Sequence, residues 1–478
     1  MADLYVSLLG VPYRALVAMP NGQRTFVRIG ERADDDYALD PNVWIDGDGA
    51  TVGAQAGFLN RSGRFGEFRP PRWQGERPAE ETSDWTDRDV LALVLRRFIT
   101  AAETQSGEPM QRLVCILPVA LIDERRALCV QAGLLAGAQA VDTLSAEDIL
   151  RSAGERRNVS GIIALVEASE DGTRLTVIDT RRSDEPPSVV QLGSGWSRTA
   201  LPELLAERLG AVTAQNGSAD PEQQRLRSEA AWALARSWVG GQDVTHGLPV
   251  AVAVAQGEPF TIFAPATVFK DLETRLAREI LEALGVYRVE PQHVRLALVT
   301  GTGRRPMAQL LRALFSGATV LEERGLEFAG ALRLAPPAPR RARHVLSSDI
   351  AATADQRSAA RALSQAQSLQ LLPKGTRLPA TSIREDFDSS AFLGRFVVTA
   401  EAEGKRLPLM SVPIPRYAER QGFSYLRVVI HAETEHFVLL ETAYLYSSKR
   451  RFVMFDKTNG TENPISDRIF RLIRQFAA

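Results

Sequence analysis

The residues best placed to do chemistry lie at positions 298–306, which read LVTGTGRRP. An apolar run here meets a Gly-x-Gly turn, and an amphipathic stretch follows. A strand that ends in such a turn and leads into a helix points free backbone N–H groups at the space above the turn, which is the geometry that binds nucleotide phosphates. Gly301, Thr302, Gly303 and Arg304 are therefore candidate nucleotide-binding residues. On the simpler interpretation, the glycines serve only the turn and Arg304 is a solvated arginine at a helix start.

Composition limits the class of protein. A chain of 478 residues with 45% hydrophobic and 24% charged residues predicts two or three globular domains. Lys plus Arg (57) nearly cancel Asp plus Glu (58), so we expect neither nucleic acid nor a membrane surface as partner. No apolar run is long enough to span a bilayer, and Met1-Ala2-Asp3 lacks the basic region of a signal peptide, so a cytoplasmic protein is expected. The Ala, Arg and Leu bias suggests a GC-rich bacterial source.

Cysteine and histidine usage gives no indication of a metal site. Cys115 and Cys129 lie in strand-like and helix-like runs and are expected to be buried free thiols, with a disulfide as the alternative. His431 and His436 lie five apart in strand-like surroundings, which places them on opposite faces. The Asp-Gly-Asp-Gly sequence at 46–49 lacks the closing glutamate of a calcium loop, so we expect a hairpin turn there.

The first two thirds of the chain alternate between strand and helix patterns. Residues 4–29 read as a strand meander, and Thr86 is a good N-cap for a helix over the apolar positions that follow, up to residue 104. A strand at 113–117 and a helix at 123–135 come next, and the same alternation recurs at 162–166 and before Gly301. This order predicts an α/β protein.

The composition changes after residue 332. Residues 335–341 read APPAPRR and predict a linker, because each proline removes a backbone donor and fixes φ. Residues 347–367 are rich in Ala and Gln and fit a helix. From 369 to 456 strand-like runs dominate and predict a small β-sandwich, and residues 465–476 predict a short amphipathic helix.

In this order the segments resemble the DnaK-type heat-shock chaperones, whose chain is a two-lobed actin-like ATPase, a linker and a β-sandwich that grips extended peptides. Residues 117–126 (LPVALIDERR) and 132–137 (AGLLAG) resemble the family's V-P-A-Y-F-N-D-x-x-R and A-G-x-x-A-G-L. Residues 299–306 resemble its adenosine loop, V-G-G-S-T-R-x-P. Residues 372–379 (LPKGTRLP) and 412–416 (VPIPR) resemble sandwich sequences of the family, and 344–350 (HVLSSDI) its interdomain V-L-L-L-D-V.

The resemblance implies a division of the chain. Residues 1–332 would form the actin-like nucleotide-binding-type domain with two lobes, and 333–368 the linker. Residues 369–460 would form the β-sandwich substrate-binding-type domain, and 461–478 a short C-terminal helix.

The residues that perform the family's chemistry are mostly missing. Its first phosphate loop, I-D-L-G-T-T-N-S, falls on residues 7–14 (SLLGVPYR), where only Gly10 is kept and the metal-coordinating aspartate is lost. Its second loop, D-L-G-G-G-T-F-D, falls on residues 167–174 (EASEDGTR). Side chains and two negative charges replace the glycines that would wrap a phosphate, so residues 169–173 are expected to form a tightened hairpin turn.

The implied adenine platform is also altered. The family's E-R-A-K-R resembles residues 232–236 (WALAR), which keep Arg236 but replace the glutamate and the lysine. Trp232 could stack on a base, or it could be a core or interface residue. Gly10, Arg236 and the four residues 301–304 are thus the candidate cofactor-binding residues, and no catalytic residue or metal ligand is predicted.

We therefore expect a degenerate DnaK-like chaperone or protein-binding scaffold with weak or no ATP hydrolysis and no required cofactor. The alternative is an active ATP-dependent chaperone, an ATP hydrolase that uses ATP with magnesium in a rearranged phosphate site. An actin-like structural protein is disfavoured because a filament protein needs no sandwich.

The end of the chain departs from the family as well. No long helical lid follows the sandwich, so residues 405–420 are expected to bind a dedicated protein or peptide partner. Pairing with a related, intact chaperone is a further expectation. Ser347 and Ser348 replace the apolar residues that dock the family's linker, which predicts weak coupling between the domains.

Overall fold

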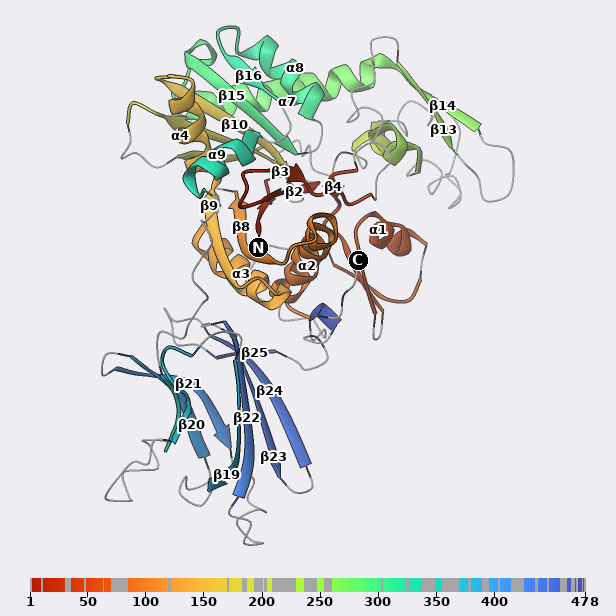
Figure 1. Cartoon of the computed structure of the whole chain (residues 1–478). Coiled ribbons are helices and arrows are strands. Elements are labelled where there is room, and N and C mark those ends of the chain that lie inside the picture. Colours follow the sequence, from red (N-terminus) through yellow and green to blue (C-terminus); the bar gives the residue numbers. More distant parts are fainter. Residues whose placement is uncertain are drawn as a thin grey trace.

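The chain is a mixed α/β protein, as the sequence predicted, followed by an all-β module (Figure 1). The computed structural model describes residues 2–9, 12–30, 36–46, 49–62, 64–69, 85–118, 122–169, 172–182, 187–192, 201, 204–208, 229–235, 247–252, 260–301, 304–322, 326–336, 349–354, 369–376, 380–388, 395–402, 405–413, 425–434, 437–444, 447–455, 462–465, 469, 472–474 and 476. Within these residues, no helix is both long enough and apolar enough to cross a membrane.

The first lobe is built on a mixed sheet with the strand order β3-β2-β1-β8-β9. Its strands are β1 (Ala2–Ser7), β2 (Tyr13–Ala18), β3 (Arg24–Phe26), β8 (Met110–Leu117) and β9 (Ala140–Ser145). Strands β1, β8 and β9 run parallel, whereas β2 and β3 form an antiparallel meander at one side, with the short β4 (Ala38–Leu39) also paired to β2. The predicted meander and the β8 strand are confirmed.

Three helices complete the first lobe: α2 (Asp87–Ser106), α3 (Ile122–Ala136) and α4 (Ala146–Arg156). The predicted N-cap Thr86 is confirmed, because its side chain accepts from the backbone N–H of Asp89 and the Asp89 carboxylate accepts from that of Thr86. Ser145 and Asp148 form the same reciprocal capping box at α4. Both helices therefore begin where their own sequence satisfies the free backbone donors.

The second lobe repeats this plan. Its sheet has the order β12-β11-β10-β15-β16, with β10, β15 and β16 parallel and β11 and β12 antiparallel. The strands are β10 (Ile162–Ser169), β11 (Gly172–Asp179), β12 (Ser188–Leu192), β15 (Val294–Gly301) and β16 (Thr319–Leu321). The helices are α7 (Ala266–Val286), α8 (Arg304–Leu314) and α9 (Leu326–Leu334), with the one-turn helix η1 (Pro291–His293) before β15.

The two lobes are topological copies of one another in sequence order, strand order and register. Each has three meandering strands, then helix, strand, helix, strand, helix. Each also shifts register by one residue after the first pair of its two central parallel strands, at Ala2 in one lobe and at Ile162 in the other. Positions in one lobe can therefore be matched to positions in the other.

Each lobe carries an insertion between its third strand and the following helix. In the first lobe this insertion holds a three-stranded sheet of β5 (Val43–Asp46), β6 (Gly49–Val52) and β7 (Glu67–Arg69), with α1 (Ala54–Arg61) packed on it. The predicted hairpin turn at 46–49 is confirmed by the Asp46–Gly49 pair. In the second lobe the insertion includes the pair β13 (Leu248–Val252) and β14 (Phe260–Ala264).

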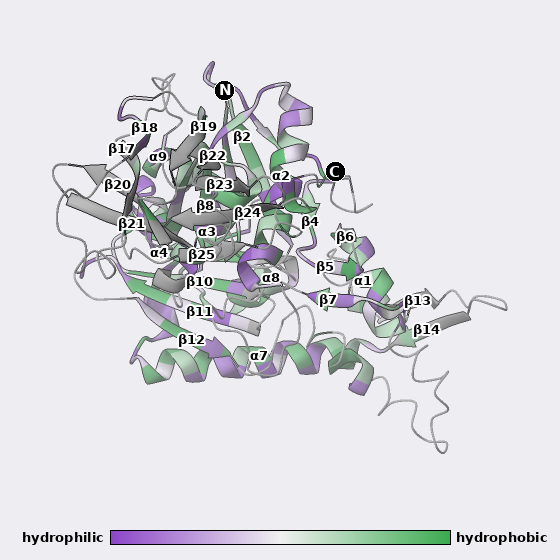
Figure 2. Ribbon diagram, turned by 90° about the horizontal axis from the view of Figure 1, so that it is seen from below, coloured by the Kyte–Doolittle hydropathy of each residue, from purple (hydrophilic) through white to green (hydrophobic). Residues whose placement is uncertain are grey.

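The apolar core has three layers. The outer face of the first sheet packs against α2 and α3, and that of the second sheet against α7 and α8. Figure 2 shows α7 along this outer side, with its hydrophobic and hydrophilic residues alternating. The inner faces of both sheets share a third cluster with α4 and α9, to which Tyr5, Ile149, Leu298 and Phe328 contribute. The lobes are thus joined by continuous apolar packing.

Cys115 on β8 and Cys129 on α3 are both buried and unbridged, which confirms the prediction of free thiols. Burial raises the pKa of the Cys129 thiol well above its ordinary value, and its hydrogen bond with Cys115 adds to this effect. The Cys129 thiol therefore stays protonated inside the first lobe.

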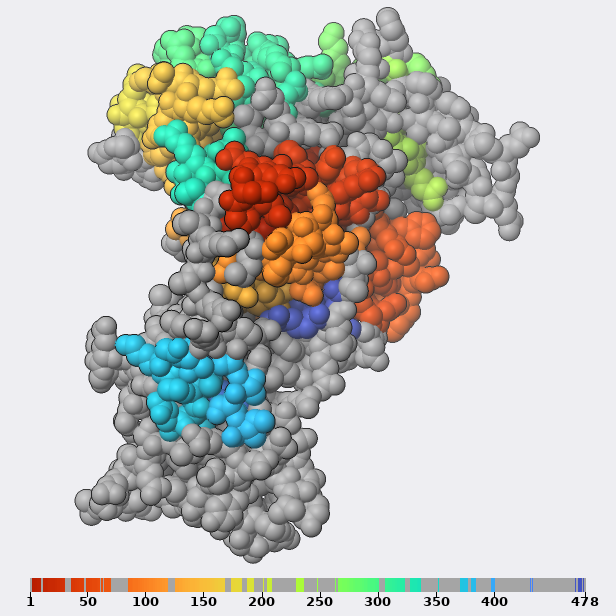
Figure 3. Space-filling model, viewed as in Figure 1, coloured from red at the N-terminus to blue at the C-terminus, as the bar shows by residue number. Residues whose placement is uncertain are grey.

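The C-terminal module contains two antiparallel sheets with the orders β18-β17-β20-β21 and β19-β22-β23-β24-β25. Their strands are β17 (Asp349–Ala354), β18 (Leu369–Leu372), β19 (Ala380–Asp388), β20 (Arg395–Ala402), β21 (Lys405–Pro413), β22 (Tyr425–Thr434), β23 (Phe437–Tyr444), β24 (Ser447–Phe455) and β25 (Glu462–Ile465). The strand-like runs of the sequence are confirmed. The light-blue residues of this module in Figure 3 lie on the side of the first lobe that is away from the second.

One predicted element is wrong. Residues 349–354, assigned to the linker and to a helical pattern, form β17, which pairs with β18 and β20. Their Ala-rich composition favours a helix only weakly, and pairing on both sides of the strand overrides that preference. Residues 462–465 likewise form the edge strand β25 before the predicted helix.

The C-terminal helix packs into the core of the first lobe. Ile469 is 3% and Ile473 0% exposed, and both belong to the cluster formed with α2 and α3. The dark-blue helical turn in Figure 1, separate from the blue strands of the β-module, lies beside these helices. The sequence pattern predicted an amphipathic helix here but gave no indication of where its apolar face would dock.

Two arginine side chains bind the carbonyl groups at the end of α3, beside the docked C-terminal helix. The last turn of α3 has no basic residue of its own. Arg474 donates to the carbonyl of Leu134 at 3.4 Å, and Arg96 of α2 donates to that of Ala136 at 3.3 Å. Gly137 leaves room for both arginines, because a Cβ there would lie 3.0 Å from Arg474 and 3.2 Å from Arg96. Two arginines from elsewhere in the chain thus satisfy the carbonyl end of α3.

Two hydrogen bonds hold the chain to the first lobe just after the end of α9. Tyr5 on β1 donates from its hydroxyl to the carbonyl of Ala335 at 2.5 Å, and Arg112 on β8 donates to that of Pro336 at 3.1 Å. Arg112 also forms ion pairs with Asp3 and Asp142. The β-module is therefore connected to the first lobe at both its entry and its exit.

Replacing Ile473 by Ala is expected to lower the free energy of unfolding of the first lobe by about 2–4 kcal/mol, since a fully buried isoleucine is truncated. Chemical denaturation followed by tryptophan fluorescence measures the change. Ile383→Ala, at a side chain 52% exposed, is the matched control and should change stability far less. Equal effects of the two substitutions would contradict the docking of the C-terminal helix.

Tyr5 gives a pH-dependent prediction. Burial, and then the charge of Asp3, raise the pKa of Tyr5 from 10.0 to about 12. The stabilisation that the protonated Tyr5 hydroxyl gives the folded chain is therefore complete below pH 10. It is lost as the pH rises towards 12, because Tyr5 ionises in the unfolded chain before it ionises in the folded one. Tyr5→Phe should cost about 1 kcal/mol at neutral pH, from the lost hydrogen bond.

The stability gap between wild type and Tyr5→Phe should then close between pH 10 and pH 12 in urea titrations. Tyr287→Phe, at a side chain 37% exposed, provides the control for general tyrosine ionisation. A gap that widens with rising pH would show that the sign is wrong.

Candidate functional site

The candidate site lies where the carboxyl ends of the central parallel strands of both sheets meet between the lobes. Gly301 is the last residue of β15 and pairs with Ala168 of β10, and Arg304 is the first residue of α8. The predicted strand and helix on either side of the turn are therefore confirmed as local structure. Gly10, Arg236, Thr302 and Gly303 lie outside the described residues, so their binding roles, like those of Gly301 and Arg304, stay predictions.

Trp232 lies in a helical stretch, residues 229–235, that packs on the outer core of the second lobe. Its neighbours Ala231, Leu234 and Ala235 are buried there, and Trp232 itself is half-buried. This surrounding favours the core or interface interpretation of Trp232 over stacking on a base.

The β10–β11 hairpin is tighter than the predicted turn at residues 169–173, because residues 169, 172 and 173 belong to the strands. Pairing continues to Ser169 and Gly172, so only residues 170 and 171 remain for the turn. Backbone groups along this segment are thus committed to the strand ladder rather than to a loop that could wrap a phosphate. In the first lobe, the N–H of Leu8 is likewise bonded to the carbonyl of Ile116 at 3.0 Å.

A buried ion pair occupies this end of the second sheet. Glu167 and Arg174 are cross-strand partners on β10 and β11, with 3.5 Å between a carboxylate oxygen and a guanidinium nitrogen. Their side chains are only 1% and 9% exposed. Arg174 also donates to the side-chain oxygen of Gln191 on β12 at 3.1 Å. An internal cation therefore neutralises the carboxylate that faces the space between the lobes.

The repeat of the two lobes places a second arginine at the matching position. Ser7 pairs with Arg14 on one side and Ile116 on the other, as Glu167 pairs with Arg174 and Thr300. Both lobes thus carry an arginine on the second strand, at the end near the cleft. The acidic partner is present only in the second lobe, because the matching residue of the first lobe is Ser7.

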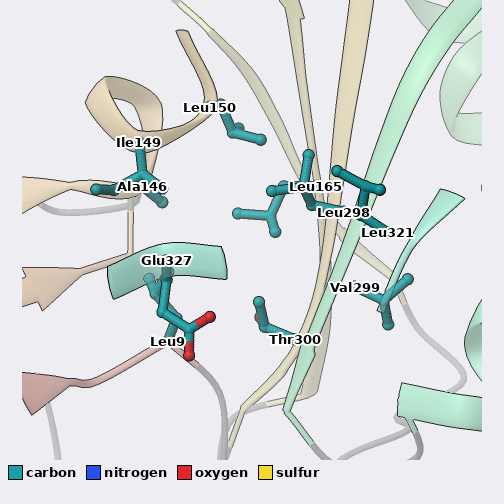
Figure 4. A pocket seen from close by; sticks show the side chains of 10 residues that line it. All are labelled: Leu9, Ala146, Ile149, Leu150, Leu165, Leu298, Val299, Thr300, Leu321 and Glu327. Carbon is teal, nitrogen blue, oxygen red and sulfur yellow. The ribbon is translucent and has the colours of Figure 1, made fainter. Parts of the chain in front are cut away.

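Little space remains between the lobes among the described residues. Two small cavities share Leu9, Val299, Thr300 and Glu327 as walls, and each has a volume of about 10 Å³. Such a cavity has room for roughly one water molecule, whereas ligand pockets measure about 300–1,000 Å³. Figure 4 shows apolar side chains from α4 and the second sheet around one cavity, with Thr300 and the Glu327 carboxylate at one end.

Thr300 has an incompletely satisfied side chain. Its hydroxyl oxygen is buried and has no hydrogen-bond partner. A buried hydroxyl without a partner costs free energy, so it is a position at which a bound ligand would be stabilising. Thr300 directly precedes Gly301 in the predicted turn.

A wider hollow of about 600 Å³ lies at the edge of the first sheet, between β3 and α2. Its charged wall residue Arg28 is paired with Asp36 at 2.9 Å. The Gln105 side chain accepts from the N–H of Arg28 and donates to the carbonyl of Phe26, so it covers the sheet edge there. These contacts protect an edge strand and converge on no reacting group.

Within the described residues, no group of three or more His, Cys, Asp or Glu side chains gathers as a metal site requires. His431 is described only in its backbone, and His436 lies outside the described residues. The candidate site offers Arg14, Thr300 and Glu327 as polar groups at a closed cleft.

The Glu167–Arg174 pair is not among the predicted site residues, although the sequence contains the signal for it. A two-residue turn at 170–171 requires residues 167 and 174 to face each other, since strands that pair in register match positions symmetrically about the turn. The role of Arg14 could not be inferred in this way, because its match to Arg174 depends on the repeat of the lobes.

Comparison with known proteins adds no relative. No model of a known protein family matches the chain, and a search of curated proteins finds no significant match.

Removing one partner of the buried ion pair should be costly. Arg174→Leu is expected to lower stability by about 3–5 kcal/mol because it removes the positive charge beside the buried Glu167 carboxylate. The double variant Glu167→Leu/Arg174→Leu should recover most of this loss, since neither charge remains. Thermal and urea unfolding of the wild type, of Arg174→Leu and of the double variant measure these differences in stability.

Arg181→Ala is the control, because the Arg181 side chain is 61% exposed in its pair with Asp179 and should leave the unfolding midpoint unchanged. A double variant less stable than Arg174→Leu would mean that packing of the two side chains, and not their charge, holds this end of the sheet.

Proposed function

We propose that this chain is a degenerate relative of the DnaK-type chaperones that acts as a binding or scaffold protein and hydrolyses ATP weakly or not at all. The proposal rests on which side chains occupy the cleft between the two lobes. Two repeated lobes enclose it, and the resemblance puts a phosphate loop at residues 167–174, where the second lobe holds the Glu167–Arg174 ion pair.

Electrostatics support this proposal. A triphosphate with magnesium needs free backbone N–H groups and an acidic metal ligand. In this chain the carboxylate of Glu167 is already paired with an arginine, and the hairpin beside it is closed by continued strand pairing. The small cavities between the described residues would have to open substantially before a nucleotide entered.

The two-sheet C-terminal module supports a role in binding a protein or peptide. Among the described residues, strand β21, Lys405–Pro413, lies at the edge of its sheet and pairs with β20. Edge strands present free backbone groups to which an extended peptide can add. This strand covers the described part of residues 405–420, where the sequence predicted a partner. Pro408 and Pro413 lack an N–H, so they restrict the positions at which such a peptide can pair.

The alternative is an active ATP-dependent chaperone with a rearranged phosphate site. Thr300 favours it, because its buried and unpartnered hydroxyl lies at the predicted Gly-x-Gly turn. Under this alternative the hydroxyl would bind a phosphate oxygen once the lobes open.

Calorimetry and thermal unfolding with 1 mM ATP and magnesium test the proposal. A ligand at a hundred times its Kd would stabilise the native state by about 2.7 kcal/mol and raise the melting temperature by several degrees. We expect no measurable heat of binding, no shift and no phosphate release.

Thr300→Val separates the two functions. If the site is inert, removing the unpartnered hydroxyl should leave stability unchanged or slightly raised, with and without ATP. Micromolar ATP binding with turnover, reduced in Thr300→Val, would overturn the leading proposal in favour of the active chaperone.

A further inference from the structure

Arginines gather at the end of the second sheet that lies opposite the cleft. Strands β10 and β15 begin at this end and run towards the cleft. Its exposed arginines, called the arginine patch below, are Arg156, Arg157, Arg181, Arg182 and Arg295. They come from the end of α4, from the turn after β11 and from the start of β15.

Contacts around Thr180 bring these three segments together. The Thr180 side-chain oxygen accepts from the N–H of Gly161 at 3.0 Å, and the N–H of Thr180 donates to the carbonyl of Gly161 at 3.0 Å. Gly161 has a φ of +135°, and a Cβ there would lie 3.3 Å from Cγ of Arg295. On α4, a Cβ at Gly154 would lie 3.7 Å from Cγ2 of Thr180, so the end of α4, the end of β11 and Arg295 meet around Thr180 and Gly161.

Arg295 is exposed and lies at the register shift in β15. Ile162 pairs with Val294 and Ile163 with Leu296, so Arg295 is the extra residue of a β-bulge. Bulges re-aim side chains at the edges of sheets and beside functional sites. The matching bulge of the first lobe skips Gln111, which is buried. The bulge itself therefore does not require an arginine.

The acidic groups nearby are already occupied. Asp179 accepts two hydrogen bonds from the Arg181 side chain and one from its backbone N–H, which lower the pKa of that carboxyl, and Glu155 is paired with Arg333 at 2.8 Å. Arg156, Arg157 and Arg295 have no ion pair or side-chain hydrogen bond within the described structure. Arg156 and Arg157 favour the negative end of α4, but Arg295 has no such local role.

We propose that the arginine patch is a docking surface for an acidic segment of a partner protein, in addition to the partner proposed for the β-module. Guanidinium groups bind carboxylates with paired hydrogen bonds, and the patch contains arginine and no lysine. A nucleic acid is less favoured, because the five patch residues include no aromatic ring on which a base can stack and the chain carries no net positive charge.

Fluorescence anisotropy with a fluorescein-labelled twelve-residue Glu/Asp peptide tests the surface in low salt. The triple variant Arg156→Ala/Arg157→Ala/Arg295→Ala should bind the peptide about tenfold more weakly than the full-length wild type. The matched control is Arg275→Ala/Arg278→Ala/Arg312→Ala, which removes the same charge from exposed positions on α7 and α8 and should change the Kd less than twofold.

A variant that removes acidic residues and a nucleic-acid probe test the same surface further. Asp184→Asn/Glu185→Gln should bind at least as tightly as wild type, because charges of the peptide's own sign are removed from the chain after Arg182. Equal losses in the two triple variants, or no peptide binding, would overturn the proposal. Tighter binding of a labelled twelve-nucleotide single strand, lost in the patch variant, would overturn it in favour of nucleic acid.

Discussion

The apolar layer between the two sheets is the constraint on which the rest of the structure depends. Both sheets bury their inner faces against α4 and α9, so the lobes share one core there instead of meeting across water. A hinge between two lobes needs a weakly packed interface, since interfaces of modest apolar area are the ones that move. In this chain, opening the cleft requires separating packed side chains such as Ile149 and Phe328.

Polar groups are confined to the two ends of that layer, and each end is internally neutralised. At one end Arg112 contacts Asp3 and Asp142 and holds the carbonyl of Pro336, and at the other Glu167 contacts Arg174. Buried charges of this kind stabilise little compared with apolar residues, but they are costly to separate. Each of these ion pairs joins strands of a single sheet, so it acts within one lobe and not between the two.

Local patterns in the sequence were sufficient for much of the fold. Thr86 with Asp89 determined where α2 begins, and the residues around 170 determined a two-residue hairpin, because both signals depend only on neighbours in the chain. The assignment failed at β17, where an Ala-rich segment pairs with strands that lie far away in sequence. The docking of Ile473 and the match of Arg14 to Arg174 depend on tertiary packing and on the repeat of the lobes, which single-sequence patterns do not contain.

The position of the C-terminal helix has a consequence for synthesis. The core of the first lobe includes Ile473, which the ribosome adds more than 300 residues after α4 ends at Arg156. At about 5–20 residues per second, that delay is roughly 15–60 s. During this time the apolar surface of α2 and α3 that Ile473 covers is exposed on the nascent chain, where it can associate prematurely before translation finishes.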